Sequence, residues 1–273
     1  MLTSTVFKLC PEVNVNLPIT LGNAFYAVLL QLVSQYDPDL AVALHDHNGP
    51  KPFTTSPLQG PQTPSGRQVL VHANEPYWLR VTSIDPYLSR IMAAIETDPP
   101  PTLRLHDGQF VVTQVSSQPQ DHPWAACTPY DALYTTALRR DRRSRPQVTL
   151  RFESPTAFNS QGRTQVLPLP RLVFGSLLQR WNQYAPFPLD EDLIEEFEIG
   201  IDIERHELKT VMQHFRRYQL QVGFVGECTY GVRQGVEEEI IWAMRLLARF
   251  ALFSGVGTRT TMGMGQVRPD TSR

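Results

Sequence analysis

The sequence predicts an α+β protein built from two tandem ferredoxin-like units, each with the element order β-α-β-β-α-β. Three observations predict this fold. Strand-like and helix-like apolar periods follow one another in that order over residues 4–117, and the same order returns over residues 148–269. An Arg-rich stretch typical of a linker separates the two series. We therefore expect domains at 1–138 and 146–273, joined by a linker at 139–145.

In the first half, two Asp-Pro pairs mark the starts of helices. Asp37-Pro38 and Asp85-Pro86 each place a capping side chain before a proline at the first helical position. A longer helix precedes both pairs, because apolar residues there recur at helical spacing. The expected helices are 21–35, 39–45 and 87–96, and the expected strands are 4–18 (broken by Pro11), 53–58, one or two within 68–84, 102–106 and 110–117.

The second half repeats this series. An acidic stretch at 190–207 is expected to be helix or loop; its carboxylates lack the spacing of a calcium or zinc site, so we interpret it as solvated surface. The helices are expected at 171–184 and 237–253, and the strands at 148–158, in a pair within 207–232 and near 265–269.

The composition indicates a globular chain with no membrane contact. With 273 residues and 41% hydrophobic side chains, the chain is long enough to bury one large core or two smaller ones. Cys10, Cys127 and Cys228 are far apart, which disfavours a disulfide framework and a structural zinc site. Because the sequence has neither a membrane-length apolar run nor a signal-peptide pattern, we expect a cytoplasmic protein.

The two halves differ in charge. The net charge of −2 gives no overall reason to expect an acidic partner. Residues 1–136, however, hold 6 Lys and Arg against 11 Asp and Glu, whereas residues 137–273 hold 19 against 16. Basic side chains are therefore concentrated in the second half, beginning at the Arg-rich stretch.

Four glycines lie close together in FSGVGTRTTMGMGQVRP (253–269), after the last expected helix and before the last expected strand. This order is the reverse of a nucleotide-binding fingerprint, so phosphate contact would come from loop amides, Arg259 and threonine hydroxyls. The loop in this position, together with LHDHNGPKPFTTSPL at 44–58, resembles the CRISPR repeat-RNA processing endoribonucleases of the RAMP superfamily. The resemblance extends over nearly the whole chain.

The resemblance implies an activity and its partners. The implied reaction is metal-independent cleavage of CRISPR repeats in precursor RNA by a 2′-hydroxyl, which leaves a 2′,3′-cyclic phosphate and a 5′-hydroxyl without a cofactor. The implied partners are repeat RNA, as a stem-loop or a single strand, and other CRISPR effector subunits. The alternative is a non-catalytic RAMP subunit that binds guide RNA in an effector complex. A histidine with a basic neighbour within 44–51 favours the enzyme, since a purely structural subunit does not need one.

Histidine suits the two proton transfers of this reaction, because its ordinary pKa lies near working pH. His45 is the first choice, since it lies at the expected end of the short helix, where the helix dipole favours an imidazolium. His47 is the competing choice, two residues further on. Lys51 follows in the same loop, from which it can turn back toward the scissile phosphate and stabilise its charge. Neither Tyr26 nor Tyr36 is assigned, although a tyrosine assists in some members of the family.

RNA contact is expected to depend on phosphate charge and therefore on salt. The candidates are the Arg-rich stretch, an arginine in the loop NSQGR and the glycine-rich loop. A solvated linker remains the alternative for the Arg-rich stretch. These candidates are Arg139, Arg140, Arg142, Arg143, Arg163, Gly255, Gly257, Thr258, Arg259, Thr260, Thr261, Gly263 and Gly265.

Overall fold

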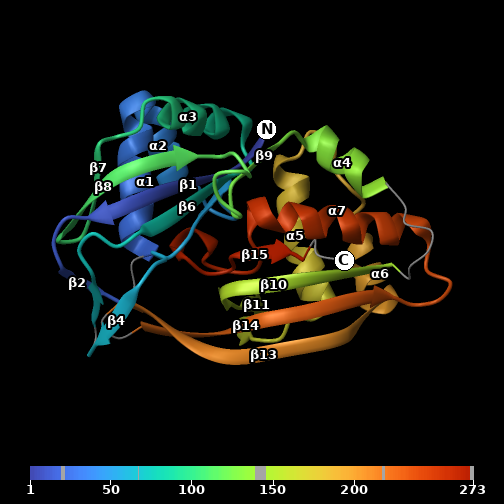
Figure 1. The fold of residues 1–273 in the computed structure, drawn as a ribbon. Helices are drawn as coiled ribbons and strands as arrows, with labels where there is room; N and C mark the ends of the chain where they lie inside the picture. Colours follow the sequence, from blue (N-terminus) through green and yellow to red (C-terminus); the bar gives the residue numbers. More distant parts are fainter. Residues whose placement is uncertain (20–21, 67, 139–145, 217–218, 271–273) are drawn as a thin grey trace. The chain divides into compact units, whose positions relative to one another are not determined.

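The computed structural model describes residues 1–19, 22–66, 68–138, 146–216 and 219–270. It divides into two compact units, each with its own sheet (Figure 1). The first unit comprises Met1–Cys127, His214–Leu220 and Thr261–Gly263, and the second Thr128–Gln213, Gln221–Thr260 and Met264–Arg273. Two short pieces of the second half of the chain thus belong to the first unit. The domain limits 1–138 and 146–273 stay a prediction.

The first unit has the predicted ferredoxin-like order. Its main sheet runs β3-β6-β1-β8-β7, with β9 also paired to β1, and β1, β3, β6 and β8 are the four strands of the β-α-β-β-α-β series. A separate sheet, β2-β5-β4, lies beside it. The strands are β1 (Leu2–Pro11), β2 (Val15–Pro18), β3 (Phe53–Thr55), β4 (Gln62–Ser65), β5 (Gln68–Val71), β6 (Tyr77–Ser83), β7 (Thr102–Leu105), β8 (Gly108–Ser116) and β9 (Ala126–Thr128), and the helices are α1 (Gly22–Tyr36), α2 (Pro38–Asp46) and α3 (Pro86–Thr97).

Both Asp-Pro pairs start helices as predicted. The Asp37 carboxylate accepts the backbone N–H of Leu40 at 2.8 Å, and that of Asp85 accepts the N–H of Leu88 at 2.7 Å. Helices α1 and α3 bury their apolar faces against the inward side chains of β1, β6 and β8, among them Phe7, and this contact forms the core of the unit.

The second unit repeats the order. Its sheet runs β13-β14-β10-β15, the same sequence of positions as β3-β6-β1-β8, so the predicted pair of ferredoxin-like units is confirmed. Strands β11 and β12 form a hairpin beside it. The strands are β10 (Gln147–Thr156), β11 (Phe158–Ser160), β12 (Arg163–Gln165), β13 (Ile201–Arg216), β14 (Gln219–Val232) and β15 (Val267–Pro269), and the helices are α4 (Tyr130–Leu138), α5 (Pro170–Tyr184), α6 (Leu193–Gly200), α7 (Glu238–Ser254) and the 3₁₀ turn η1 (Thr260–Met262).

Two local expectations need correction. Helix α4 was not predicted: it forms because its aromatic side chains pack in the second unit, with the Tyr130 ring 5.3 Å from that of Trp181 and the Tyr134 ring 4.7 Å from that of Trp242. The helix in the acidic stretch ends at Gly200. Strand β13 begins at the next residue, Ile201, six residues before the predicted start at 207. None of the described helices is long and apolar enough to cross a membrane.

Candidate active site and glycine-rich loop

The candidate histidines lie where α2 ends. His45 stands exposed in the last turn of this helix, and His47 is its half-buried C-cap residue, with its backbone N–H donated to the Ala43 carbonyl at 3.0 Å. The Asp37 cap and the proline after it fix where the helix starts, and therefore which face its last turn presents. The sequence predicted that this helix ends near His45, and in the structure it ends at Asp46.

Lys51 folds back onto the end of the same helix. Its ammonium donates to the carbonyls of Leu44, His45 and His47 at 2.6, 2.9 and 3.0 Å. A lysine ammonium has three N–H donors, so these three carbonyls occupy all of them. Burial lowers the pKa of Lys51, and the nearby Asp46 carboxylate opposes that shift. In this structure Lys51 is therefore a side-chain cap of α2, which holds both histidines in place.

Lys51→Met is expected to slow the RNA cleavage that the family resemblance implies by about tenfold, the effect of losing a cap worth about 1–2 kcal/mol. The reason is that the end of α2 loses its three donors, and hydrogen exchange at the His47 amide should quicken accordingly. Lys8→Met, which changes the other described lysine of the first unit, is the control. A slower reaction with unchanged His47 exchange would instead mean that Lys51 acts on the RNA directly.

Tyr26 links His45 to strand β3. Its ring is half-buried, stacked on Phe53 at 5.8 Å between centroids, and 6.3 Å from the His45 ring. Burial, with a smaller contribution from Asp46, raises the pKa of Tyr26, so its phenol stays protonated near neutral pH. It is therefore a neutral hydroxyl beside His45, whereas Tyr36 is 46% exposed and points to no partner among the described contacts.

Strand β3 also receives the tip of the glycine-rich loop. The Thr55 hydroxyl, which is fully buried, donates to the Thr261 carbonyl at 2.8 Å. Gly263 has φ of +88°, and a Cβ built on it would lie 3.2 Å from the Pro57 nitrogen. The tip thus packs directly on the segment that follows Lys51. Within the first unit, a continuous set of contacts runs from His45 through Tyr26 and β3 to the loop tip.

The base of the loop has a tightly specified backbone in the second unit. The N–H groups of Val256, Thr258 and Gly265 donate to the carbonyls of Gly265, Ala157 and Pro155 at 3.0, 2.9 and 3.0 Å. At Gly257 and Gly265, where φ is +78° and +68°, an added Cβ would overlap a backbone carbonyl oxygen. These amides are therefore engaged within the protein, and the expectation that loop amides contact phosphate does not hold for them.

The remaining predicted residues are dispersed. Arg139, Arg140, Arg142 and Arg143 lie outside the described residues. Arg163 is exposed on β12, where its strand pairs with β11. Within the loop, the Thr258 hydroxyl donates to the Ala157 carbonyl at 3.2 Å, Arg259 is half-buried with φ of +55°, and Thr260 is buried.

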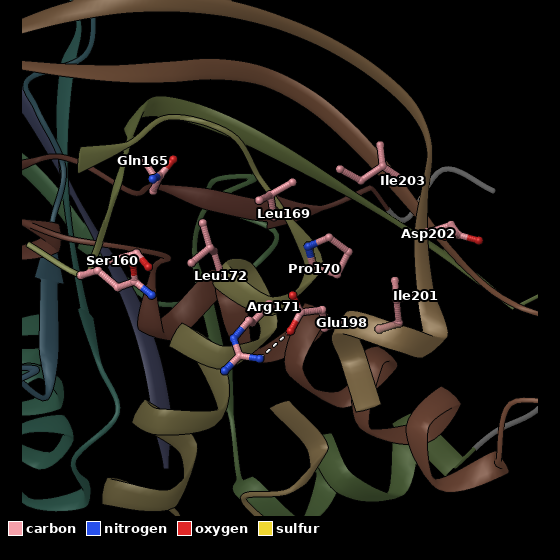
Figure 2. Close-up of a pocket in the computed structure, with 11 residues that line it drawn as sticks. Ser160, Gln165, Leu169, Pro170, Arg171, Leu172, Glu198, Ile201, Asp202 and Ile203 are labelled. Carbon is pink, nitrogen blue, oxygen red and sulfur yellow. Dashed lines mark hydrogen bonds and ion pairs between the residues drawn. The ribbon is translucent and has the colours of Figure 1, made fainter. Parts of the chain in front are cut away.

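An open pocket of about 630 Å³ lies in the second unit, under the β11–β12 hairpin and beside the start of α5 (Figure 2). Its wall is mixed: apolar side chains such as Leu169, Leu172 and Ile201 alternate with polar ones. Across it, Arg171 forms an ion pair with Glu198. Neither the candidate catalytic residues nor the glycine-rich loop lines this pocket.

Sequence reasoning missed two side chains that hold the loop, Thr55 and Arg180. Arg180 carried a recognisable signal: it lies three residues after Leu177 and seven after Val173, both fully buried, so it occupies an apolar position of α5. Thr55 carried none, since its acceptor is more than two hundred residues away. Among the described residues, no group of three or more His, Cys, Asp or Glu side chains could hold a metal ion.

Family profiles match both halves of the chain. The profile described as CRISPR Cas6 N-terminal domain matches residues 1–135, and that of CRISPR-associated endoribonuclease Cas6 matches residues 150–267. Two curated proteins named CRISPR-associated endoribonuclease Cas6 are similar to this chain. The one from Streptococcus thermophilus is 31% identical over 120 residues, and the one from Mycobacterium tuberculosis is 36% identical over 119 residues. These alignments cover 43% of this chain and only 48% and 37% of the relatives, so less than half of either relative is matched.

Solved structures extend the similarity to almost the whole chain. Cas6 of Thermus thermophilus, in a product complex, has a TM-score of 0.79 and 28% identity over 98% of this chain and 100% of that one. A second Cas6 product complex has a TM-score of 0.75 and 28% identity over 99% of each chain. With both family profiles and these structures in agreement, the chain belongs to the Cas6 family of CRISPR-associated proteins.

Proposed function

We propose that this protein is a metal-independent endoribonuclease that cleaves CRISPR repeats in precursor RNA to give mature guide RNAs. The observation that carries the proposal is the arrangement at the end of α2. There the ring of an exposed histidine, His45, lies 6.3 Å from the ring of Tyr26, whose phenol is neutral, while Lys51 binds the His45 carbonyl. Family membership supports the same activity, because the matching profile and the curated relatives are named endoribonucleases.

The proposed chemistry is attack of a 2′-hydroxyl on the adjacent phosphorus. The P–O bond to the 5′-oxygen breaks, which leaves a 2′,3′-cyclic phosphate on one fragment and a 5′-hydroxyl on the other. An imidazole can remove the proton from the attacking hydroxyl or deliver one to the leaving oxygen. Exposure of His45 lets its imidazole reach an RNA backbone. The Lys51 ammonium, bound to the His45 carbonyl, adds positive charge near the phosphate while it stays on the helix end.

The proposed partner is repeat RNA. Relatives of this fold have been solved as Cas6 product and substrate-mimic complexes, at 26–28% identity over nearly the whole chain. In this chain, Arg259 and the hydroxyls of Thr258 and Thr261 lie on the loop whose tip packs beside the histidine segment. Arginine is suited to phosphate contact, so binding should weaken as salt rises.

The proposal is tested with labelled repeat RNA in EDTA. We expect one cut in the repeat and a 2′,3′-cyclic phosphate on the upstream fragment, measured by mass. A matched RNA with a single 2′-deoxynucleotide at the cut site should bind equally and stay intact, because it lacks the nucleophile. Cleavage of the deoxy substrate, or dependence on added metal, would refute the chemistry. Tight binding without any cleavage would support the non-catalytic RAMP subunit instead.

A further inference from the structure

A single buried arginine contacts four acceptors at the start of the glycine-rich loop. Arg180 of α5 is 6% exposed. Its Nη1 donates to the carbonyls of Ser254 and Gly255 at 3.2 and 2.9 Å, and its Nη2 donates to the Gly257 carbonyl at 2.7 Å and meets the Thr260 hydroxyl at 3.4 Å. All four acceptors fall within seven consecutive residues.

One of these acceptors, the Ser254 carbonyl, belongs to the end of a helix, and the others lie in the turn that follows it. The last carbonyls of a helix have no partner within the helix, and a cation near that end is favourable to its dipole. Helix α7 ends at Ser254, and the chain leaves it through Gly255, whose φ is +64°. The planar guanidinium fork reaches carbonyls on either side of this turn, which a lysine ammonium cannot do in the same geometry. Arg180 therefore caps α7 and fixes the loop at once.

Arg180 also keeps its charge without a carboxylate. None of the ion pairs among the described residues includes it. Burial lowers the pKa of Arg180 to about 10, with Tyr184 opposing the shift, so the guanidinium remains protonated at neutral pH. Carbonyl dipoles, rather than an opposite charge, offset part of the cost of burial. A net positive charge thus lies directly beneath the loop.

We propose that Arg180 is a positioning residue for RNA binding: it holds the glycine-rich loop in its binding shape and places a fixed positive charge under the loop surface. This inference rests on the proposed function. The loop carries Thr258 and Arg259, so a change at its base alters the position of the side chains that we propose meet RNA. The expected defect is in binding, since Arg180 itself is buried away from RNA.

The test uses Arg180→Met and Arg180→Lys in the full chain, with two measurements. The first is single-turnover cleavage against protein concentration. We expect Arg180→Met to raise the half-saturating concentration by about tenfold, the effect of losing charge-assisted bonds to carbonyls, with the rate at saturation nearly unchanged. Arg180→Lys should give an intermediate value, because it keeps the charge but loses the fork.

The second measurement is hydrogen exchange at the amides of Val256, Thr258 and Gly265, which should quicken in Arg180→Met and not in the strands of the first unit. Arg80→Met is the matched control. Arg80 is also a buried arginine, 1% exposed, with its guanidinium 4.3 Å from the Trp124 ring centroid and its pKa lowered to about 9 by burial. Its removal measures the general effect of losing a buried guanidinium that donates to Ser4 of the first unit and to none of the carbonyls that Arg180 contacts.

The outcomes separate the two proposals. Unchanged loop exchange and unchanged half-saturation in Arg180→Met would overturn the positioning role, and so would equal loop effects in Arg80→Met. If Arg180→Met only reduces the fraction of protein that is active, and the active molecules bind RNA with normal affinity, then Arg180 is needed for folding and not for positioning the loop. If the wild type binds repeat RNA without cutting it, the proposed activity fails, whereas fluorescence anisotropy and hydrogen exchange still decide the role of Arg180.

Discussion

Replacement of His45 by alanine is expected to slow single-turnover cleavage of repeat RNA by about 10²- to 10⁴-fold, the contribution of a positioned general acid or base. RNA affinity should be unchanged, because the imidazole is exposed and anchors no part of the fold. The measurement is the rate at saturating protein, in EDTA, with affinity determined separately on the uncleavable deoxy substrate.

His47→Ala is the matched control for this experiment. His47 caps α2 through its backbone N–H, which the alanine variant keeps, so we expect a much smaller change in rate. If His47→Ala loses the rate and His45→Ala retains it, the two roles are exchanged; if neither variant is slower, the catalytic group lies elsewhere.

Gly265→Ala is expected to destabilise the protein by about 3 kcal/mol, from positive-φ strain plus a steric clash. Its φ is +68°, and an added Cβ would overlap the Val256 carbonyl oxygen, the backbone group next to the turn that Arg180 caps. Backbone atoms cannot swing aside as a flexible side chain can, so the loop must change shape. Urea unfolding gives the free-energy change, and repeat-RNA affinity should fall in parallel because the loop moves.

Gly235→Ala separates the steric clash expected at Gly265 from the backbone strain of a positive φ. Gly235 also belongs to the second unit and has φ of +86°, but nothing lies within 4 Å of the Cβ that would be added. Its cost should be only about 1 kcal/mol, the usual cost of alanine at positive φ. Equal destabilisation in the two variants would show that the crowding at Gly265 relaxes freely and that the loop is not tightly packed.

Local chemistry made much of the fold predictable. Each Asp-Pro pair needs only its own next three residues to start a helix, so Asp37 and Asp85 could be interpreted from sequence. The element order followed from apolar periodicity in the same way. Helix α4 could not be predicted, because its stability comes from tertiary contacts such as that between Tyr130 and Trp181, which no local window contains.

The candidate site was predictable in its residue types and less so in their contacts. The resemblance pointed to His45 and Lys51, but nothing in the order of residues shows that the ammonium turns onto three carbonyls of its own helix. Arg180 illustrates the same difficulty. Its apolar position on α5 marks it as buried, whereas its acceptors lie some 75 residues further along the chain and depend on how α7 ends.

The hydrogen bond from Thr55 to Thr261 has a consequence for the order in which the protein is made. During synthesis the N-terminal part of a chain emerges and folds first. Here the first unit includes Thr261–Gly263, which follow the whole of the second unit's sheet strands β10 to β14 in the sequence. The buried Thr55 hydroxyl therefore lacks its acceptor until 206 further residues have been translated. The unit that is translated first therefore gains one of its buried hydrogen bonds only after most of the second unit has been translated.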